Sequence, residues 1–411
     1  MIEFEQFTLD NGLRVILCPD QATQMVTVNL MYDVGARDES PERTGFAHLF
    51  EHLMFGGTPG IPDYDNYVEK AGGQNNAFTS NDLTNYYISL PSANLETALW
   101  LEADRMAGLA FTEKSLDVQR KVVVEEFKQR YLNQPYGDVY LLMRPLAFKK
   151  HPYQWPTIGK NIQHVEEASM QEVKDFFYAH YAPANAVLCL SGGFNSESAK
   201  ALVEHYFGPI PPRDPKPRFL PEEPKQDSQR RMRVERDVPV SVLYMAFHMG
   251  GRLDPDYPAT DLLSDVLGNG ESSRLHKDLV QEKPLFSSIS AYVGGDRDPG
   301  LFYIAGKLND GVDFETAEAG IWELISNLQT QGVSEDELKK VKNKYLTNFL
   351  FSQVKGLSKA INLCYYSLLG DPNLLNETQV WYERVSPQDV QNMAAEILRA
   401  ENVSVLEYAK K

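Results

Sequence analysis

The chain has 411 residues, more than a single compact core usually holds, and this length predicts at least two domains. The composition is that of an ordinary globular protein, and the formal net charge of −17 argues against a nucleic-acid-binding protein or a surface for anionic lipid. No apolar run approaches the roughly 18 residues that a membrane span requires, and the opening MIEFEQFTLDNG lacks a leader pattern. We therefore expect a cytoplasmic protein with no membrane and no nucleic-acid partner; a periplasmic location stays open if a leader was removed.

The first half alternates between strand and helix patterns. Asn11-Gly12 is typical of a two-residue turn between strands, and Gly56-Gly57 closes an apolar, helix-like run. In chain order we expect a hairpin over 7–20, a strand within 25–39, helices at about 45–55 and within 61–72, a hairpin over 76–91, and long helices over 95–109 and 113–130. This mixture predicts an α+β domain with a mostly antiparallel sheet packed with helices.

The same pattern restarts in the second half. Residues 238–270 echo residues 25–57, with a strand, a glycine, an Arg-x-acid turn, an apolar helix and a closing glycine in the same order. Residues 333–349 match residues 111–127 without a gap. An internal duplication is the simplest account, and it predicts two related α+β domains.

The segment between the two copies indicates where the domains end. It is rich in proline and charge and shows little apolar periodicity, as is typical of a linker. We therefore expect an N-terminal domain over 1–215, a linker over 216–236 and a C-terminal domain over 237–411.

The two copies differ in the residues that carry chemistry. Aligning them pairs His48 with Asp261, Glu51 with Ser264, His52 with Asp265 and Glu126 with Asn348. Apolar positions such as Leu49 and its counterpart Leu262 are kept. The scaffold repeats while the candidate site does not, so the C-terminal domain is predicted to lack a metal site.

The stretch HLFEH, residues 48–52, is the most informative motif. Side chains four apart on a helix share one face, so His48 and His52 can point at one metal ion, with Glu51 beside them as a general base. A catalytic zinc needs three protein ligands and one open position. An isolated HxxxH more often belongs to an ordinary amphipathic helix, but HxxEH is the inverted form of HExxH and a zinc-peptidase signature.

The third ligand must come from another part of the chain. Glu125 and Glu126 lie within the apolar run KVVVEEF, where a carboxylate is costly unless it is paired or bound to metal. Spacing alone leaves both acids open as ligands. The other six histidines have no partner at metal spacing, and we expect surface or packing roles for them.

Together these features resemble the inverted-zincin (HxxEH) peptidases of the pitrilysin/insulinase type. HLFEH matches the family's HxxEH and QRKVVVEEF matches its second motif, and the resemblance covers essentially the whole chain. In length it resembles the short, mitochondrial-processing-peptidase-like branch. The resemblance implies that His48, His52 and Glu126 bind Zn²⁺, that Glu51 is the catalytic base, and that Gln119 hydrogen-bonds a zinc ligand.

The resemblance also implies how a peptide would bind. In the family, a substrate adds a strand to an exposed sheet edge beside the zinc, inside a chamber formed by two chains. The expected edge comprises Asn76, Ala77, Phe78, Thr79 and Ser80, although a plain structural strand explains this stretch as well. We expect a zinc-dependent endopeptidase that hydrolyses peptides or unfolded segments inside a dimeric chamber. A non-catalytic subunit or binding scaffold of the same fold is the alternative.

Departures from the family pattern bear on the partner. Gln119 stands where the family often has glutamate. An Arg/Tyr pair in the family's second half helps to hold substrate; Val280 and Ser287 stand at those positions here and cannot do so. Arg274 lies nearby, and we expect it to be a structural ion-pair residue. The missing pair favours a heterodimer with a related chain that supplies it, while a homodimer stays open.

Overall fold

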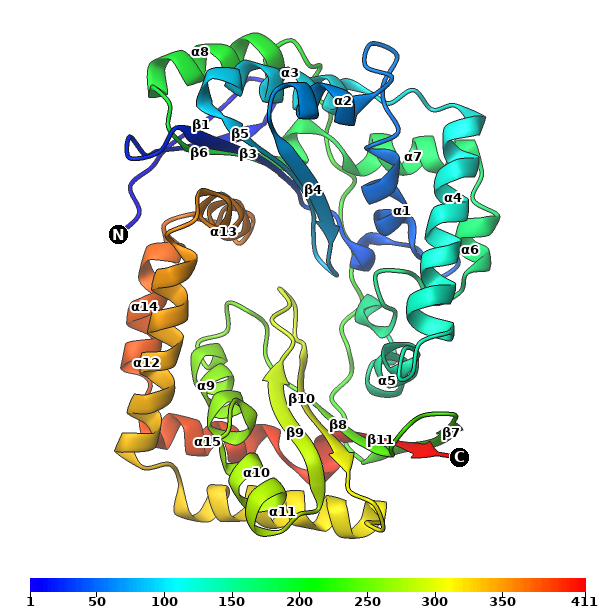
Figure 1. Ribbon diagram of the computed structural model, residues 1–411, viewed down its shortest axis with the longest axis vertical. Helices are drawn as coiled ribbons and strands as arrows, with labels where there is room; N and C mark the ends of the chain where they lie inside the picture. The colour runs from blue at the N-terminus through cyan, green and yellow to red at the C-terminus, as the bar shows by residue number, and fades with distance from the viewer. The chain divides into compact units, whose positions relative to one another are not determined.

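The computed structural model describes residues 1–411 and divides into two compact units, neither of which is continuous in sequence. Unit 1 comprises Met1–Gln129, Trp155–Leu220 and Leu350–Glu377, and unit 2 comprises Arg130–Gln154, Pro221–Phe349 and Thr378–Lys411. Each unit has one mostly antiparallel sheet covered by helices (Figure 1). The predicted α+β fold class is confirmed.

Unit 1 is built on a six-stranded sheet with the order β1-β2-β6-β3-β5-β4. Its strands are β1 (Glu5–Thr8), β2 (Arg14–Pro19), β3 (Met25–Tyr32), β4 (Gln74–Thr79), β5 (Thr84–Pro91) and β6 (Ala186–Gly192). Both expected hairpins are present, since β1 pairs with β2 and β4 with β5 in antiparallel register. Strand β6 lies between β2 and β3 and runs parallel to β2. Strand β4 forms one edge of the sheet.

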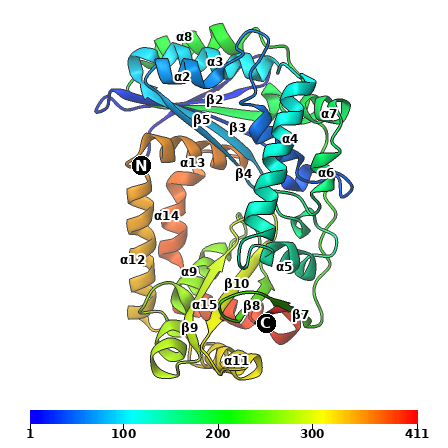
Figure 2. The same ribbon diagram turned by 45° about the vertical axis from the view of Figure 1, so that its right-hand side comes forward.

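Helices cover both faces of this sheet. Helices α3 (Leu95–Ala107) and α8 (Ser196–Phe207) pack together over one face, and α13 (Gly356–Leu368) packs on the other face against β3 and β6 (Figure 2). The other α-helices of unit 1 are α1 (Phe46–Leu53), α2 (Tyr64–Lys70), α4 (Glu113–Phe127), α6 (Gln163–Glu166) and α7 (Met170–His180). The buried Cys364 of α13 lies with its sulfur 3.3 Å from Asn29 Nδ2 of β3. The sheet of unit 1 is therefore completed by a helix from near the end of the chain.

Unit 2 is built on a five-stranded sheet with the order β7-β11-β8-β10-β9. Its strands are β7 (Arg230–Arg236), β8 (Val242–His248), β9 (Phe286–Val293), β10 (Leu301–Leu308) and β11 (Val403–Lys410). The order and directions repeat those of β2-β6-β3-β5-β4, because the first pair is parallel and the other pairs are antiparallel in both sheets. The duplication expected from the sequence is thus also visible in the strand order.

The sheet of unit 2 has a large core on one face and a smaller one on the other. The large core is covered by α9 (Tyr257–Gly268), α10 (Arg274–His276), α11 (Phe314–Gln331) and α15 (Pro387–Ile397). The smaller core contains α5 (Val139–Ala147). Two further helices, α12 (Glu335–Ser352) and α14 (Leu374–Arg384), contain boundaries between the units.

The compact units do not follow the expected domain boundaries. The segment after α4, residues 130–154, carries α5 and belongs to unit 2, whereas the segment 350–377 carries α13 and belongs to unit 1. The two segments hold equivalent places in the repeat, so each copy lends a helix to the sheet of the other copy. The single boundary expected near the middle of the chain does not describe this exchange of helices.

The expected linker over 216–236 is partly regular structure, and that prediction is corrected. Residues 230–236 form β7, which pairs in parallel with β11. Its apolar residues alternate with charged ones, so Met232 and Val234 pack on the smaller core while Arg231 pairs with Glu318. Four arginines in seven residues concealed this strand pattern. Earlier in the segment, Arg218 forms an ion pair with Asp33 at 3.1 Å within unit 1.

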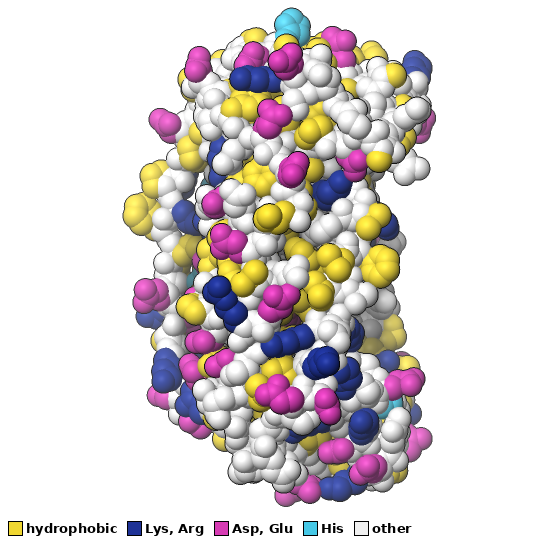
Figure 3. Space-filling model, turned by 90° about the vertical axis from the view of Figure 1, so that its left-hand side faces the viewer, with side chains coloured by type: hydrophobic (Ala, Val, Ile, Leu, Met, Phe, Trp, Pro, Cys, Tyr) yellow, Lys and Arg dark blue, Asp and Glu magenta, His cyan; other side chains and the backbone are white.

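The surface carries both signs of charge. Acidic and basic side chains are interspersed with apolar ones on the face shown in Figure 3. None of the helices combines the length and the apolar character that a membrane span requires.

Candidate metal and active site

Helix α1 carries the HLFEH motif and presents two different faces. Its apolar residues, among them Leu49 and Phe50, are fully buried in unit 1. His48, Glu51 and His52 form the other face, and the two imidazole rings meet edge to face with centroids 4.9 Å apart. The helix therefore uses its apolar face for packing and its polar face for chemistry.

The start of α1 is held by the buried acid side chain of Glu39, a contact that the sequence did not reveal. Glu39 accepts hydrogen bonds from the backbone N–H groups of Gly45 and Ala47, each at 2.9 Å. Burial raises the pKa of Glu39 to about 8, although both hydrogen bonds oppose that rise. Gly45 has a φ of 89°, and a Cβ there would lie 2.8 Å from the Ile158 carbonyl oxygen. These contacts fix where α1 begins and hence where His48 lies.

The middle of α1 is also anchored. The hydroxyl of Tyr86 on β5 donates to the Phe50 carbonyl at 3.2 Å. The guanidinium of the buried Arg105 lies 4.5 Å from the centre of the Tyr86 ring and pairs with the buried Glu102. The buried Glu102–Arg105 ion pair thus supports Tyr86, which contacts α1.

Helix α4 packs against α1 and distinguishes the two candidate acids. Glu125 is exposed and pairs with Lys128 at 2.7 Å. Glu126 points to α1 instead, with its Oε2 3.1 Å from His48 Nε2 and 3.3 Å from His52 Nε2. The geometry therefore brings Glu126, and not Glu125, to the two histidines.

The three side chains fit a divalent metal. One potential ligand atom from each of His48, His52 and Glu126 lies within 4.8 Å of the others. Ligands at about 2.0–2.2 Å around a tetrahedral zinc lie roughly 3.3–3.6 Å apart. The distances from Glu126 Oε2 to the two imidazole nitrogens, 3.1 and 3.3 Å, are close to this range. His52 Nε2 is buried and makes no hydrogen bond, despite its closeness to Glu126. A buried ring nitrogen without a hydrogen bond is costly unless a metal ion takes it.

Charges at the site favour a protonated His48. Burial alone would lower the pKa of His48, but hydrogen bonds and charge from Glu126 and Glu51 outweigh it and raise that pKa to about 9. Burial opposes ionisation of Glu51, yet His48 and Thr79 hold the pKa of Glu51 below its usual range. Zinc binds neutral imidazole, so a metal ion would take the place of the His48 proton.

Glu51 is held by the edge strand. Thr79 Oγ1 donates to Glu51 Oε2 at 2.7 Å, and His48 Nδ1 lies 3.3 Å from the same oxygen. The sequence singled out Thr79 only as part of a strand. No sequence signal indicated that its hydroxyl reaches the motif, because the contact depends on how β4 packs beside α1.

The predicted edge strand needs one correction. Strand β4 ends at Thr79, so it contains Asn76, Ala77, Phe78 and Thr79 but not Ser80. The Ser80 hydroxyl accepts the N–H groups of Asp82 and Leu83, each at 3.1 Å, and so forms the turn to β5. Serine at a turn commonly bonds the backbone two or three residues ahead in this way.

The other residues that the family resemblance singled out lie on different elements. Gln119 is half-buried on α4, two turns before Glu126, and its contact with a ligand stays a prediction. Arg274 pairs with Glu337 at 2.7 Å, which confirms the expected structural ion pair. Val280 lies after α10, and Ser287 lies on β9.

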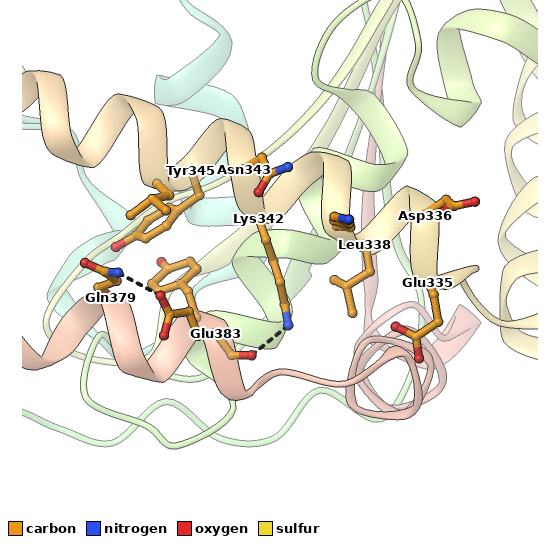
Figure 4. A pocket seen from close by; sticks show the side chains of 11 residues that line it. Glu335, Asp336, Leu338, Lys342, Asn343, Tyr345, Gln379 and Glu383 are labelled. Carbon is orange, nitrogen blue, oxygen red and sulfur yellow. Dashed lines mark hydrogen bonds between the residues drawn. The ribbon is translucent and has the colours of Figure 1, made fainter.

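In the second copy, residues that make ordinary hydrogen bonds stand at the positions of the candidate ligands. Asp261, the counterpart of His48, accepts a hydrogen bond from the Tyr382 hydroxyl at 2.5 Å. Asp265, the counterpart of His52, accepts one from Asn269. Tyr345 of α12 stacks on Tyr382 with ring centres 3.4 Å apart, at one end of a pocket of about 500 Å³ (Figure 4). The stacked rings of Tyr345 and Tyr382 therefore lie beside Asp261 in unit 2.

Comparison with known proteins identifies the family. The family described as "Insulinase (Peptidase family M16)" matches residues 14–159, and "Peptidase M16 inactive domain" matches residues 167–345. The "Zinc protease PqqE" of Helicobacter pylori is 30% identical over 401 residues, which cover 96% of this chain and 90% of that protein. The chain belongs to the insulinase (M16) family of peptidases, as the HxxEH motif predicted.

Other relatives agree with this assignment. The "Probable mitochondrial-processing peptidase subunit beta" of Arabidopsis thaliana is 28% identical over 308 residues, covering 72% of this chain and 57% of that protein. The crystal structure of a protease from Helicobacter pylori superposes with a TM-score of 0.93 at 29% identity and covers 100% of both chains. A chain of "Complex III2 from Candida albicans" shares the fold at 18% identity, with a TM-score of 0.81 over 99% of this chain and 96% of that one.

Proposed function

We propose that this chain is a zinc-dependent endopeptidase in which His48, His52 and Glu126 hold Zn²⁺ and Glu51 is the general base. One observation carries the proposal: three zinc-type ligand atoms lie within 4.8 Å of one another, and the buried nitrogen of His52 has no hydrogen bond. The family membership supports the same reading, since its relatives are named zinc proteases.

The residues around the cluster have distinct tasks in the proposed reaction. When bound, zinc would polarise the peptide carbonyl and acidify water. Glu51 accepts the proton of the attacking water and passes it to the leaving amine. Its Oε2 is engaged by Thr79 and His48, which leaves Oε1 to carry the proton. Substrate main chain pairs with the free edge of β4, so binding makes little demand on sequence.

The test compares single substitutions in the full chain. Glu51→Gln should keep zinc and lower kcat at least ~100-fold, since general acid–base catalysis commonly contributes that much. His52→Ala should lose both zinc and turnover. Glu125→Gln is the matched control for Glu126→Gln, because Glu125 is exposed and pairs with Lys128. Comparable peptide cleavage by wild type and Glu51→Gln would refute the assignment of the base.

We further propose that the active form is a dimer with an enclosed chamber and that a related chain supplies the Arg/Tyr pair. Val280 and Ser287 stand where that pair is expected, and neither side chain can bind a peptide carbonyl with a charge. The Arabidopsis thaliana relative is itself described as a peptidase subunit. Assays of the chain alone and with any co-purifying chain test this idea, and strong activity from a homodimer would contradict it.

The second candidate function is a non-catalytic subunit of the same fold. It is favoured by the match of residues 167–345 to the family described as "Peptidase M16 inactive domain". The assembled cluster of His48, His52 and Glu126 opposes it. Zinc content of the purified protein, with and without a chelator, separates the two functions.

A further inference from the structure

Thr79 connects the edge strand β4 to α1, the helix that carries the HLFEH motif. It is the last residue of β4, and its hydroxyl donates to Glu51 Oε2 at 2.7 Å. Glu51 lies on α1, which packs beside β4. The side chain of one edge-strand residue therefore restrains the carboxylate that we assign as the base.

The backbone of the same residue faces the free edge. Ser80 N–H donates to the Leu83 carbonyl at 2.8 Å, which makes Ser80 and Leu83 a hydrogen-bonded pair. Bonded and non-bonded pairs alternate in an antiparallel ladder, so Thr79 opposite Thr84 is a non-bonded pair. The N–H and C=O groups of Thr79 consequently point away from β5. Ala77, opposite Tyr86, has the same orientation.

The orientation of Ala77 supports this register. Its N–H is met by the Asn76 side-chain oxygen at 2.9 Å, as expected for a donor that no neighbouring strand takes. An added peptide strand would offer its own carbonyl oxygen in place of that amide. The edge thus presents backbone groups of Ala77 and Thr79 to a peptide.

We propose that Thr79 is a positioning residue that couples the addition of a substrate strand to the orientation of the Glu51 carboxylate. The proposal rests on the proposed function. A peptide that pairs with the backbone of Thr79 fixes that residue, and its hydroxyl then fixes Glu51 Oε2, which leaves Oε1 directed to the reacting water. Thr79 acts through Glu51 and contributes nothing to holding the metal.

The experiment uses the full chain, loaded with zinc and purified with any accompanying chain. Thr79→Val keeps the shape of the side chain and removes the hydroxyl, and Thr79→Ser keeps the hydroxyl. A fluorogenic peptide gives kcat and KM, and zinc content is measured on each protein. In the Glu51→Gln background, the Kd for the uncleaved peptide is compared with and without Thr79→Val.

We expect Thr79→Val to lower kcat ~10–100-fold, the range found for residues that orient catalytic and metal-binding groups. KM, peptide Kd and zinc content should stay within about twofold, since the hydroxyl touches neither peptide nor ligand. Thr79→Ser should recover most of the lost kcat.

Two results would overturn the proposal while leaving the peptidase assignment intact. One is an unchanged kcat for Thr79→Val. The other is a change in KM, peptide Kd or zinc content as large as the change in kcat, since Thr79 would then act through binding or folding. A wild-type protein that binds zinc but cleaves no peptide would overturn the proposed function and this inference together.

Discussion

Zinc binding should release a proton from His48, and this linkage can be measured directly. The pKa of His48 is raised to about 9 by Glu126 and Glu51, against the effect of burial. Zinc binds only the neutral ring, so protons compete with the metal at every pH below that value. A pH of 7 lies about two units below this pKa, so proton competition should weaken the apparent zinc affinity by roughly 100-fold.

The sign of the effect follows from this competition. Apparent zinc affinity should rise about tenfold per pH unit between pH 6.5 and 8.5, with about one proton released per zinc. Titration calorimetry of chelator-stripped protein, in buffers with different ionisation enthalpies, gives both the affinity and the proton count.

Two variants sharpen the experiment. Glu51→Gln removes one of the groups that raise the pKa of His48, so zinc should bind more tightly to it at pH 7. His205→Gln changes an exposed histidine outside the cluster and should reproduce the wild-type curve. A flat affinity from pH 6.5 to 8.5, or no proton release at pH 7, would refute the reasoning.

Two further predictions concern the support of the site. Glu102→Gln should destabilise the protein by about 3–5 kcal/mol in denaturant unfolding, because it leaves the buried Arg105 charge unpaired. The double variant Glu102→Gln, Arg105→Met should recover most of that loss. Equal stability of Glu102→Gln and wild type would contradict the prediction. A fragment of residues 1–220 should aggregate or unfold at a lower temperature than the intact chain, because it lacks α13. A separate peptide of residues 350–377 should restore its cooperative melting. A fragment that melts like the intact chain would show that α13 is dispensable.

Much of the architecture could be predicted because it is local. Apolar periodicity and turn residues located the hairpins and helices of the first half, and Asn11-Gly12 does join β1 to β2. The unit 2 strand β7 escaped notice because its arginines resemble a solvated segment. The charge of Arg231 is matched only by Glu318 and Glu407, which are distant in sequence.

The candidate site was only partly predictable for a similar reason. Helical spacing placed His48, Glu51 and His52 on one face, but it could not choose between Glu125 and Glu126. Adjacent residues on a helix point about 100° apart, so the packing of α4 on α1 decides which acid meets the histidines. The Thr79 hydroxyl and the Glu39 carboxylate contact the motif helix through tertiary packing, and no spacing rule reports such contacts.

The sequence by itself determined the motif, the duplication and the α+β class, because each follows from residue spacing along the chain. Tertiary structure alone decided which sheet each exchanged helix covers. An amphipathic helix specifies that its apolar face must be buried, yet two related sheets in one chain offer it similar partners. The same packing chose Glu126 over Glu125 and set Thr79 beside Glu51, since both outcomes depend on how elements distant in sequence come together.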